Sequence, residues 1–354
     1  MWIITSPYFW IFGLFLALVY PYHQSNKGTK ENIAVFCLVL IVLFFGLRGD
    51  IGDDYAVYRD IYGRVSFRDV FTYGPGFTFI SLLLKFLCVP FHGFLGFCSF
   101  VTNILLFRFL QKAHCNLPFA LAVFFAKWGI INEANFIRNM FGIVLFLNSL
   151  EYIQKRNFLK FSLLNLIGLS FHVSSLLYVP FYWILYRRLP HMVYVAVFEV
   201  AMLFFLIRPG FLDIIPLHFD CKQSFWSSHL CEYITSFKQH RSTFLFWSES
   251  FLTGVVVCCF YKKLTADRFS LIVVNSFLVN SLFFGLFSAY WMLASRLANL
   301  FGFCYWLLYP TFILKLIKNN VCRFLAFIIM LFFMFCRLEN IASLPQWNYS
   351  IYPF

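Results

Sequence analysis

A run of charged and aromatic residues follows directly on an apolar stretch, with the sequence Arg48-Gly-Asp-Ile-Gly-Asp-Asp-Tyr-Ala-Val-Tyr. Beside the arginine it holds three carboxylates and two phenols, on Asp50, Asp53, Asp54, Tyr55 and Tyr58. Clustered carboxylates raise one another's pKa and a nearby guanidinium lowers it, so a carboxylate of this run is suited to act as a general base. The tyrosine rings can stack on a sugar or hydrogen-bond its hydroxyls. The alternative is a solvated loop with local ion pairs.

Two further arginines stand at the edges of apolar stretches. Arg138 lies in Asn132-Glu-Ala-Asn-Phe-Ile-Arg-Asn, and Arg296 ends Ser288-Ala-Tyr-Trp-Met-Leu-Ala-Ser-Arg. An arginine at bilayer depth is costly and commonly faces a cavity or an anion, and its planar fork matches phosphate with two hydrogen bonds. Two such arginines on separate spans favour an anion site, in which directed donors would suit a pyrophosphate. The alternative for each is a side chain that extends to the outer headgroups.

A histidine interrupts another apolar region, in Ser170-Phe-His-Val-Ser-Ser. The apolar halves on either side are short for a full crossing, so we expect His172 at the tip of a shallow hairpin. An ionisable group at such a depth is a functional candidate, and histidine can move a proton near neutral pH. The alternative is a capping or packing role for His172 and Ser174.

The elements that must position these residues are membrane helices. Of the 354 residues, 61% are hydrophobic and 12% are charged, against about 25% charged in soluble proteins. Apolar stretches near the length of a transmembrane helix recur from Trp2 to Cys336. They lack the alternation of β-barrel strands. We therefore predict an all-α, polytopic transmembrane helix bundle that forms one domain, residues 1–354.

Basic residues predict which side of the membrane each loop faces. Five clusters fall on one side, the cytoplasm, if both termini lie outside; they are Lys27 and Lys30, Lys155 to Lys160, Arg187 and Arg188, Lys262 to Arg268, and Lys315 to Arg323. This explains much of the net charge of +13 without nucleic acid. Segments 48–75 and 209–241 then become outer loops. Parity requires a broken or re-entrant segment near 77–97, which leaves about twelve crossings.

The loop 209–241 shows no diagnostic ligand spacing, and the chain has no nucleotide-binding glycine loop and no zinc motif. We therefore expect no metal and no cofactor. Cys221 and Cys231 can form a disulfide if this loop lies outside the cytoplasm, or stay reduced.

In this arrangement the chain resembles the EpsG-like group of Wzy polysaccharide polymerases. The matching pieces, in order along most of the chain, are Arg48 with Gly52, Asp54 and Tyr58, then Phe136-Ile-Arg138-Asn139, Lys155 to Phe161, Phe171 to Ser175, Arg296, and Tyr352-Pro-Phe. One piece departs from the pattern: Gly74-Pro-Gly-Phe lacks the acidic residue that precedes Pro-x-Phe in the group.

The resemblance implies transfer of a growing glycan from undecaprenyl pyrophosphate onto the next lipid-linked repeat unit, as in O-antigen or capsule synthesis. The site would face the periplasm at the outer surface of the bacterial inner membrane, with a chain-length regulator as a possible partner. Arg138 and Arg296 would neutralise the leaving pyrophosphate, and Asp54 or His172 would accept the proton of the attacking hydroxyl. The remaining candidates for binding substrate are Arg48, Asp53, Tyr55, Tyr58 and Asn139.

Other functions stay open at this point. A flippase or other transporter of lipid-linked oligosaccharides would share the arginines, but would more often show repeat symmetry and charges deep in its spans. A membrane O-acyltransferase would need a histidine deeper in the bundle. A ligase that moves glycan onto a lipid A core belongs to the same class as the polymerase.

Overall fold

The computed structural model describes residues 6–208, 210 and 244–351. Within these ranges every named element is helical, and the one extended pairing is an isolated bridge between Arg48 and Ile351. The all-α prediction is confirmed. Nearly all of the predicted outer loop 209–241, with Cys221 and Cys231, lies outside the described residues.

The chain divides into two compact units, Met1–Ile184 with Trp306–Phe354 and Leu185–Tyr305, here called the first and second unit. The prediction of one transmembrane domain therefore stays a prediction.

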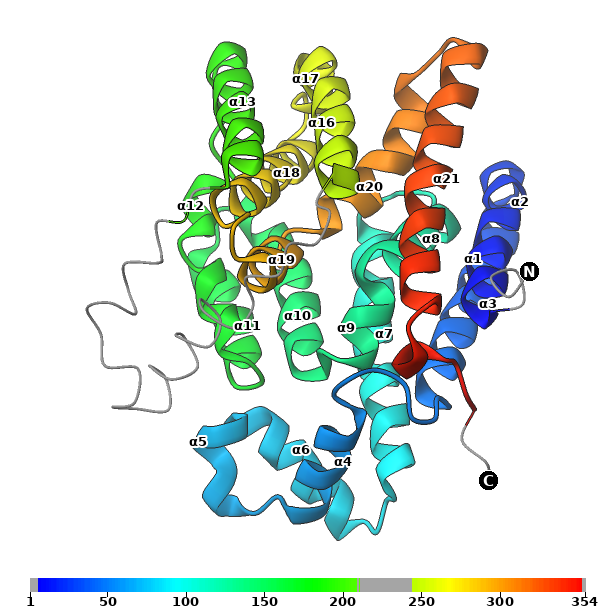
Figure 1. The fold of residues 1–354 in the computed structure, drawn as a ribbon, viewed down its shortest axis with the longest axis vertical. Coiled ribbons are helices and arrows are strands. Elements are labelled where there is room, and N and C mark those ends of the chain that lie inside the picture. The colour runs from blue at the N-terminus through cyan, green and yellow to red at the C-terminus, as the bar shows by residue number, and fades with distance from the viewer. Residues whose placement is uncertain (1–5, 209, 211–243, 352–354) are drawn as a thin grey trace. The chain divides into compact units, whose positions relative to one another are not determined.

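Most helices belong to the first unit (Figure 1). They are α1 (Pro7–Ala17), α2 (Val19–Gln24), α3 (Lys27–Gly46), α4 (Tyr55–Arg64), η1 (Phe67–Asp69), α5 (Val70–Tyr73), α6 (Pro75–Phe86), α7 (Phe91–Lys112), α8 (Leu117–Phe124), the π-helical η2 (Phe125–Gly129), α9 (Ile130–Ala134), α10 (Ile137–Gln154), α11 (Phe158–Leu169), η3 (Val173–Tyr178), α12 (Phe181–Ile184), η5 (Phe312–Leu316), α21 (Asn320–Ala342) and η6 (Pro345–Trp347). The second unit holds α13 (His191–Ile207), α16 (Phe244–Cys259), α17 (Tyr261–Leu264), α18 (Arg268–Leu286) and α19 (Trp291–Asn299), and α20 (Phe303–Thr311) joins the units.

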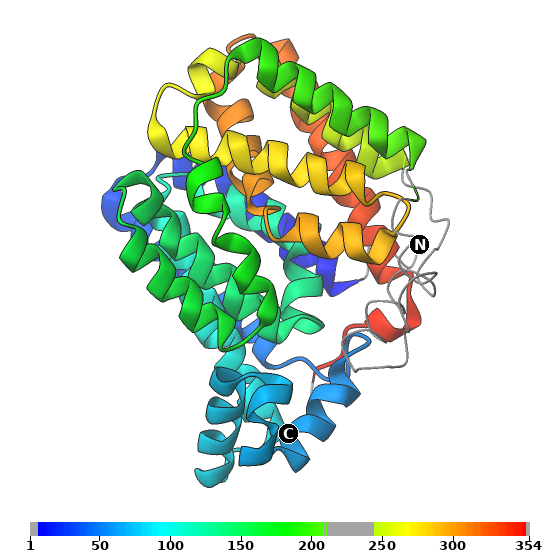
Figure 2. The same cartoon turned by 90° about the vertical axis from the view of Figure 1, so that its left-hand side faces the viewer.

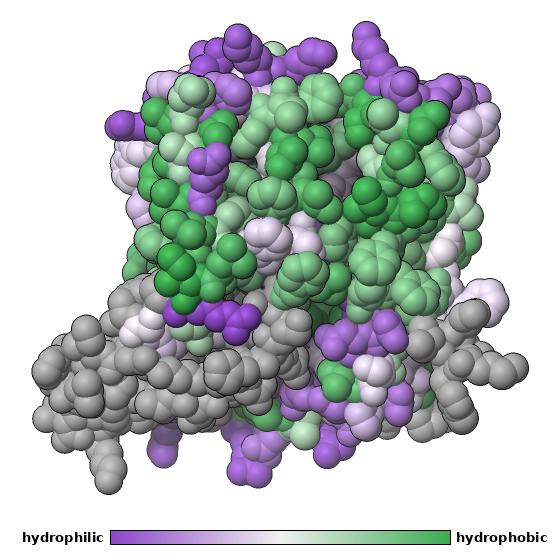
Figure 3. Space-filling model, turned by 45° about the horizontal axis from the view of Figure 1, so that its top comes forward, coloured by the Kyte–Doolittle hydropathy of each residue, from purple (hydrophilic) through white to green (hydrophobic). Residues whose placement is uncertain are grey.

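Five described helices are long and apolar enough to cross a membrane: Lys27–Gly46, Phe91–Lys112, Leu117–Ala134, Arg268–Leu286 and Asn320–Ala342. A bent pair, Trp291–Asn299 with Phe303–Leu316, adds a sixth if it is one span. On the face shown in Figure 3, apolar side chains cover the flanks of the helices and hydrophilic side chains gather at their ends. The chain is thus a polytopic helical membrane protein, while about twelve crossings and outer termini stay predictions.

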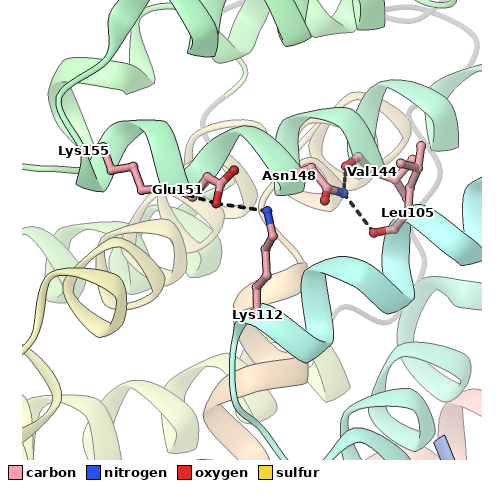
Figure 4. Close-up of polar contacts among 6 residues, drawn as sticks. All are labelled: Leu105, Lys112, Val144, Asn148, Glu151 and Lys155. Carbon is pink, nitrogen blue, oxygen red and sulfur yellow. Dashed lines mark hydrogen bonds and ion pairs between the residues drawn. The ribbon is translucent and has the colours of Figure 1, made fainter. Parts of the chain in front are cut away.

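The helices of the first unit share a common sidedness. A Cβ on Gly46 would lie 3.2 Å from the Cα of Gly96, and Ser99 Oγ donates to the Val42 carbonyl, so α3 and α7 pack closely and antiparallel. At the other end of α7, Lys112 forms an ion pair with Glu151 of α10 at 3.0 Å (Figure 4). We call these two ends of the unit the Arg48 end and the Lys112 end.

Three of the five basic clusters lie in the first unit, and all stand at the Lys112 end. Lys27 and Lys30 begin α3, Lys155 to Lys160 join α10 to α11, and Lys315 to Arg323 precede or begin α21. The last of these helices runs from there to the tail, where Tyr349 donates to the Phe44 carbonyl beside Arg48. The agreement supports the predicted sidedness.

The region 77–97 differs in part from the prediction. Within it, residues from Phe91 onward are the first turns of the long α7, and the short α6 precedes them. The apolar helix α6 has 12 residues and spans roughly 18 Å, which is short of the hydrocarbon thickness of roughly 30 Å. Two candidate spans, α7 and Leu117–Ala134, therefore join Arg48 to Arg138. An even number of crossings leaves Arg48 and Arg138 on the same side of the membrane, as the charge pattern requires.

Candidate functional site

Arg48 lies in a loop that the chain's tail holds in place. Its side chain is 2% exposed. The backbone N–H groups of Gly49 and Gly52 donate to the carbonyls of Ser350 and Gln346 at 2.7 and 2.9 Å. Gly52 has a φ of +90°, and a Cβ there would lie 2.2 Å from the Asn135 amide oxygen, so this turn requires glycine. Residues 48–54 therefore form a structured turn that leads into α4.

A buried carboxylate faces the same interior as Arg48. Glu133, at the end of α9, is 5% exposed. Its oxygens accept hydrogen bonds from the Thr102 hydroxyl at 3.1 and 3.2 Å and from the Asn103 amide at 3.2 Å. Arg48 and Glu133 both line a cavity of ≈ 10 Å³, which is about the room that one water molecule needs.

Burial lowers the pKa of Arg48, and the opposing charge of Glu133 raises it. An arginine stays protonated even so. One of its terminal nitrogens, Nη1, is buried without a hydrogen-bond partner among the described residues. Glu133 therefore lies within electrostatic reach of a guanidinium that the fold has taken out of solvent.

Asn135 joins the carboxylate run to the helices. It stands at the break between α9 and α10, and its amide donates to Asp53 at 3.1 Å and accepts from the Asp54 N–H at 3.4 Å. Asp50 and Asp53 are exposed and Asp54 is half-buried at the start of α4. The run thus lies over the beginning of α10.

The side chain of Arg138 lies against Tyr73 of α5 and Phe77 of α6. Its Nη1 donates to the Tyr73 carbonyl at 2.9 Å, and its guanidinium carbon lies 5.9 Å from the Tyr73 ring centroid and 5.8 Å from that of Phe77. Burial raises the pKa of Tyr58, the positive charge of Arg138 lowers it, and Asp54 raises it. Arg138 and Asp54 therefore act on the same phenol. The arginine's Nε is buried without a hydrogen-bond partner among the described residues.

His172 is linked to the neighbour of Arg138. Its Nδ1 accepts from the Ser174 N–H at 3.2 Å and lies 2.7 Å from the Ser174 hydroxyl, which donates to the Asn139 amide oxygen at 2.6 Å. The histidine therefore caps η3, as the alternative interpretation expected, and it also lies in one polar chain with Asn139. The apolar segment after His172 is not one α-helix: it consists of the 3₁₀ helix η3 followed by the short α12.

Gly74 and Gly76 pack closely against Ser170, just before His172, and so place the histidine at the Arg48 end. The Gly76 N–H donates to the Ser170 carbonyl at 2.8 Å, and a Cβ on Gly74 would lie 2.5 Å from that same oxygen. The rings of Phe141 and Phe171 stack at 4.5 Å. The Gly-Pro-Gly run after α5 therefore joins α6 to the end of α11.

Tyr55 and Arg296 are the two remaining residues that were predicted to bind substrate. The buried Tyr55 hydroxyl lies 3.3 Å from His92 Nε2, so this phenol has a structural partner within the protein. Arg296 lies on α19 in the second unit, so a joint site with Arg138 stays a prediction.

Glu133 and the polar residues around it were not predicted as site residues from the sequence. The available signal is the polar set Ser99, Thr102 and Asn103, which recurs at spacings of three and four on the otherwise apolar α7 and therefore lies on one side of it. In the part of the chain that the structure describes, no three His, Cys, Asp or Glu side chains gather as metal ligands would.

The helices and their sidedness define the class, a polytopic α-helical membrane protein with a polar cluster at one end of its first unit. A family model described as the EpsG family matches residues 31–354. The chain therefore belongs to the EpsG family, relatives of Wzy-type polymerases, and the resemblance seen in the sequence is confirmed. Comparisons with curated proteins and with solved structures found no match.

Proposed function

We propose that this protein is a polysaccharide polymerase of the bacterial inner membrane. It transfers a glycan from undecaprenyl pyrophosphate onto the next lipid-linked repeat unit, at the periplasmic face. The observation that carries the proposal is the cluster at the start of α10, where Arg138 and Asn139 meet Tyr58, Tyr73 and the His172–Ser174 pair. Family membership supports a role in polysaccharide synthesis.

Arg138 is suited to the leaving group. Its guanidinium is directional and permanently charged, and the carbonyl and rings of the α5–α6 segment hold it in one orientation. Fixed donors stabilise charge that grows in a transition state without reorganising during the reaction. When the glycosidic bond to the pyrophosphate breaks, negative charge grows on the bridging oxygen, and Arg138 would neutralise it.

The hydrogen bonds divide the roles of the two predicted bases. Nδ1 of His172 contacts Ser174, at 3.2 Å from its N–H and 2.7 Å from its hydroxyl, so the ring is held in one orientation as a positioning group. Asp54 is an acceptor at the same end of the unit, within electrostatic reach of Tyr58. We therefore assign the proton acceptor to Asp54 and the orientation of a sugar or phosphate oxygen to His172. Asn139 would hold Ser174 and so the ring.

Asp53, Tyr58 and Arg48 have supporting roles in this proposal. Asp53 is bonded to Asn135 and stays exposed, so it can meet sugar hydroxyls. The buried Tyr58 connects Asp54 to Arg138. Arg48 is enclosed by the tail and by Glu133, so it acts by holding the turn that carries Asp54 rather than by touching substrate.

Deletion of the gene tests the proposal through the surface glycan. A polymerase deletion should leave single repeat units attached to the final acceptor, which run as one short band on a gel. Complete loss of surface glycan would indicate a flippase, and an unchanged ladder would indicate an O-acyltransferase. Either of these results would overturn the proposal.

A further inference from the structure

The segment between α3 and α7 exposes large apolar side chains although it is separate from the long spans. Phe67 is 79% exposed and Phe71 is 95% exposed. Four more exposed side chains on and after α6 complete a set that we call the aromatic rim: Phe67, Phe71, Phe79, Leu83, Phe86 and Leu87. Burial of large apolar side chains is favourable, so such an exposed set indicates an interaction surface.

The rim is one side of an amphipathic layer. Phe67 and Phe71 are four residues apart across η1 and α5, and the α6 members are spaced by four and three residues, which places each group on one side of its helix. The opposite side of α6 is buried through Phe77 and Leu84 in a core shared with α4, and Tyr73 of α5 packs partly against that core. In Figures 1 and 2 this layer lies beyond the end of α10.

Basic residues border the rim, and the nearby acids are already engaged. Arg64 and Arg68 are exposed on either side of Phe67. Asp60 is paired with Arg64 at 2.5 Å, and Asp69 accepts from the N–H and hydroxyl of Ser66 at 2.8 Å as a cap of η1. Exposed aromatic side chains flanked by cations are typical of helices that lie in the interface of a membrane containing anionic lipids.

The apolar surface continues along the chain onto a membrane span. After Leu87 the chain enters α7, where the exposed Phe97, Phe100 and Ile104 share one side of that candidate span. The occupant of this side of a membrane helix is lipid. A lipid surface is therefore the partner that fits the rim as well.

We propose that the layer α4–α6 lies in the headgroup region of the bilayer, with Phe67 and Phe71 at the acyl boundary and Arg68 against anionic phospholipid headgroups. The same layer supplies the Tyr73 carbonyl and the Phe77 ring to Arg138. Lipid contact thereby sets the depth of that guanidinium. The proposal is independent of the polymerase function and fails or stands separately from it.

Photo-crosslinking tests the proposal on the full chain. The photoreactive analogue p-benzoyl-phenylalanine replaces Phe71 or Phe67, both highly exposed, in protein held in nanodiscs of phosphatidylethanolamine and phosphatidylglycerol. Asp60, on the side of α4 opposite its buried tyrosines, carries the analogue as a control. We expect phospholipid adducts by mass spectrometry at Phe67 and Phe71 and background at Asp60. The phosphatidylglycerol share of these adducts should fall when Arg68→Ser is added.

Absence of lipid adducts at both phenylalanine positions overturns the proposal, as does equal labelling at Asp60. The same variants irradiated in native membranes provide the remaining outcome. A dominant crosslink from Phe71 to another protein would show that the rim docks a protein partner, and would also overturn it.

Discussion

The hydroxyl of Ser174 donates to the Asn139 amide oxygen at 2.6 Å and so joins the start of η3 to the first turn of α10. Because Asn139 follows Arg138 directly, this contact sets where His172 stands relative to the arginine. Two residues 35 positions apart thereby place a histidine and a guanidinium at the same end of the first unit.

Arg138→Ala should abolish long glycan chains while the protein still inserts. Loss of one fixed donor to a transition-state charge costs roughly 10²–10³ in rate, so the gel ladder should collapse to short products. Arg138→Lys should rescue poorly, because an ammonium lacks the planar fork that Tyr73 and Phe77 orient. The matched control is Arg64→Ala, an exposed arginine of α4 paired with Asp60. Normal ladders in the Arg138→Ala strain would remove the role of this residue.

Asp54 and His172 should separate when each is replaced. Asp54→Asn removes the proposed proton acceptor and should stop polymerisation, whereas His172→Gln keeps a side chain able to donate and should leave a reduced ladder. Glycan length distributions in strains with equal protein levels measure the difference. The reverse order of severity would assign the base to His172 instead.

Glu133→Ala should destabilise the protein because it leaves the buried Thr102 hydroxyl and Asn103 amide without their acceptor. An unsatisfied buried donor costs about 1–3 kcal/mol, which should appear as a lower Tm in detergent. The double variant Arg48→Met with Glu133→Gln should be more stable than Arg48→Met or Glu133→Gln alone, because it removes both charges together. Additive losses would show that the two charges do not interact.

Two glycines should respond in opposite ways to alanine. Gly52→Ala puts a Cβ on a residue with φ +90° and against Asn135, so it should lower stability by more than about 1 kcal/mol. Gly63→Ala, in α4 with nothing within 4 Å of the new Cβ, should be neutral or raise stability by about 0.5–1 kcal/mol. Thermal unfolding of the purified variants measures both. A similar Tm for the two would contradict the turn geometry.

Two native cysteines should report the sidedness. Cys88 follows α6 near the Arg48 end, Cys322 begins α21 at the Lys112 end, and both are exposed. A membrane-impermeant thiol reagent should modify Cys88 in spheroplasts and Cys322 only after permeabilisation. Peptide mass spectrometry distinguishes them without substitutions, and the opposite pattern would invert the orientation.

The sidedness of the candidate residues was predictable from sequence because it follows from charge. Arg48 and Arg138 stand at ends of spans opposite to the basic clusters, and His172 interrupts an apolar region, so local patterns placed all three together. The structure brings them to one end of the first unit. The segment 48–75 was expected as a loop because its apolar runs are short, yet α4 and α5 form there through tertiary packing.

The partners of individual side chains were not predictable. Tyr55 pairs with His92, 37 residues away, and no local pattern contains that contact. Glu133 escaped notice because its partners lie on another helix, although the polar side of α7 carried a signal. Such contacts depend on which helix faces mate, and a nearly uniform apolar composition leaves those faces unmarked.

The polymerase activity is tested most directly with the purified protein in liposomes that contain defined undecaprenyl-pyrophosphate-linked repeat units. We expect lipid-linked glycans of increasing length, with one undecaprenyl pyrophosphate released for each repeat transferred, and loss of both products with Arg138→Ala. Movement of unextended repeat units across the bilayer, with no glycan elongation, would contradict the proposed polymerase activity.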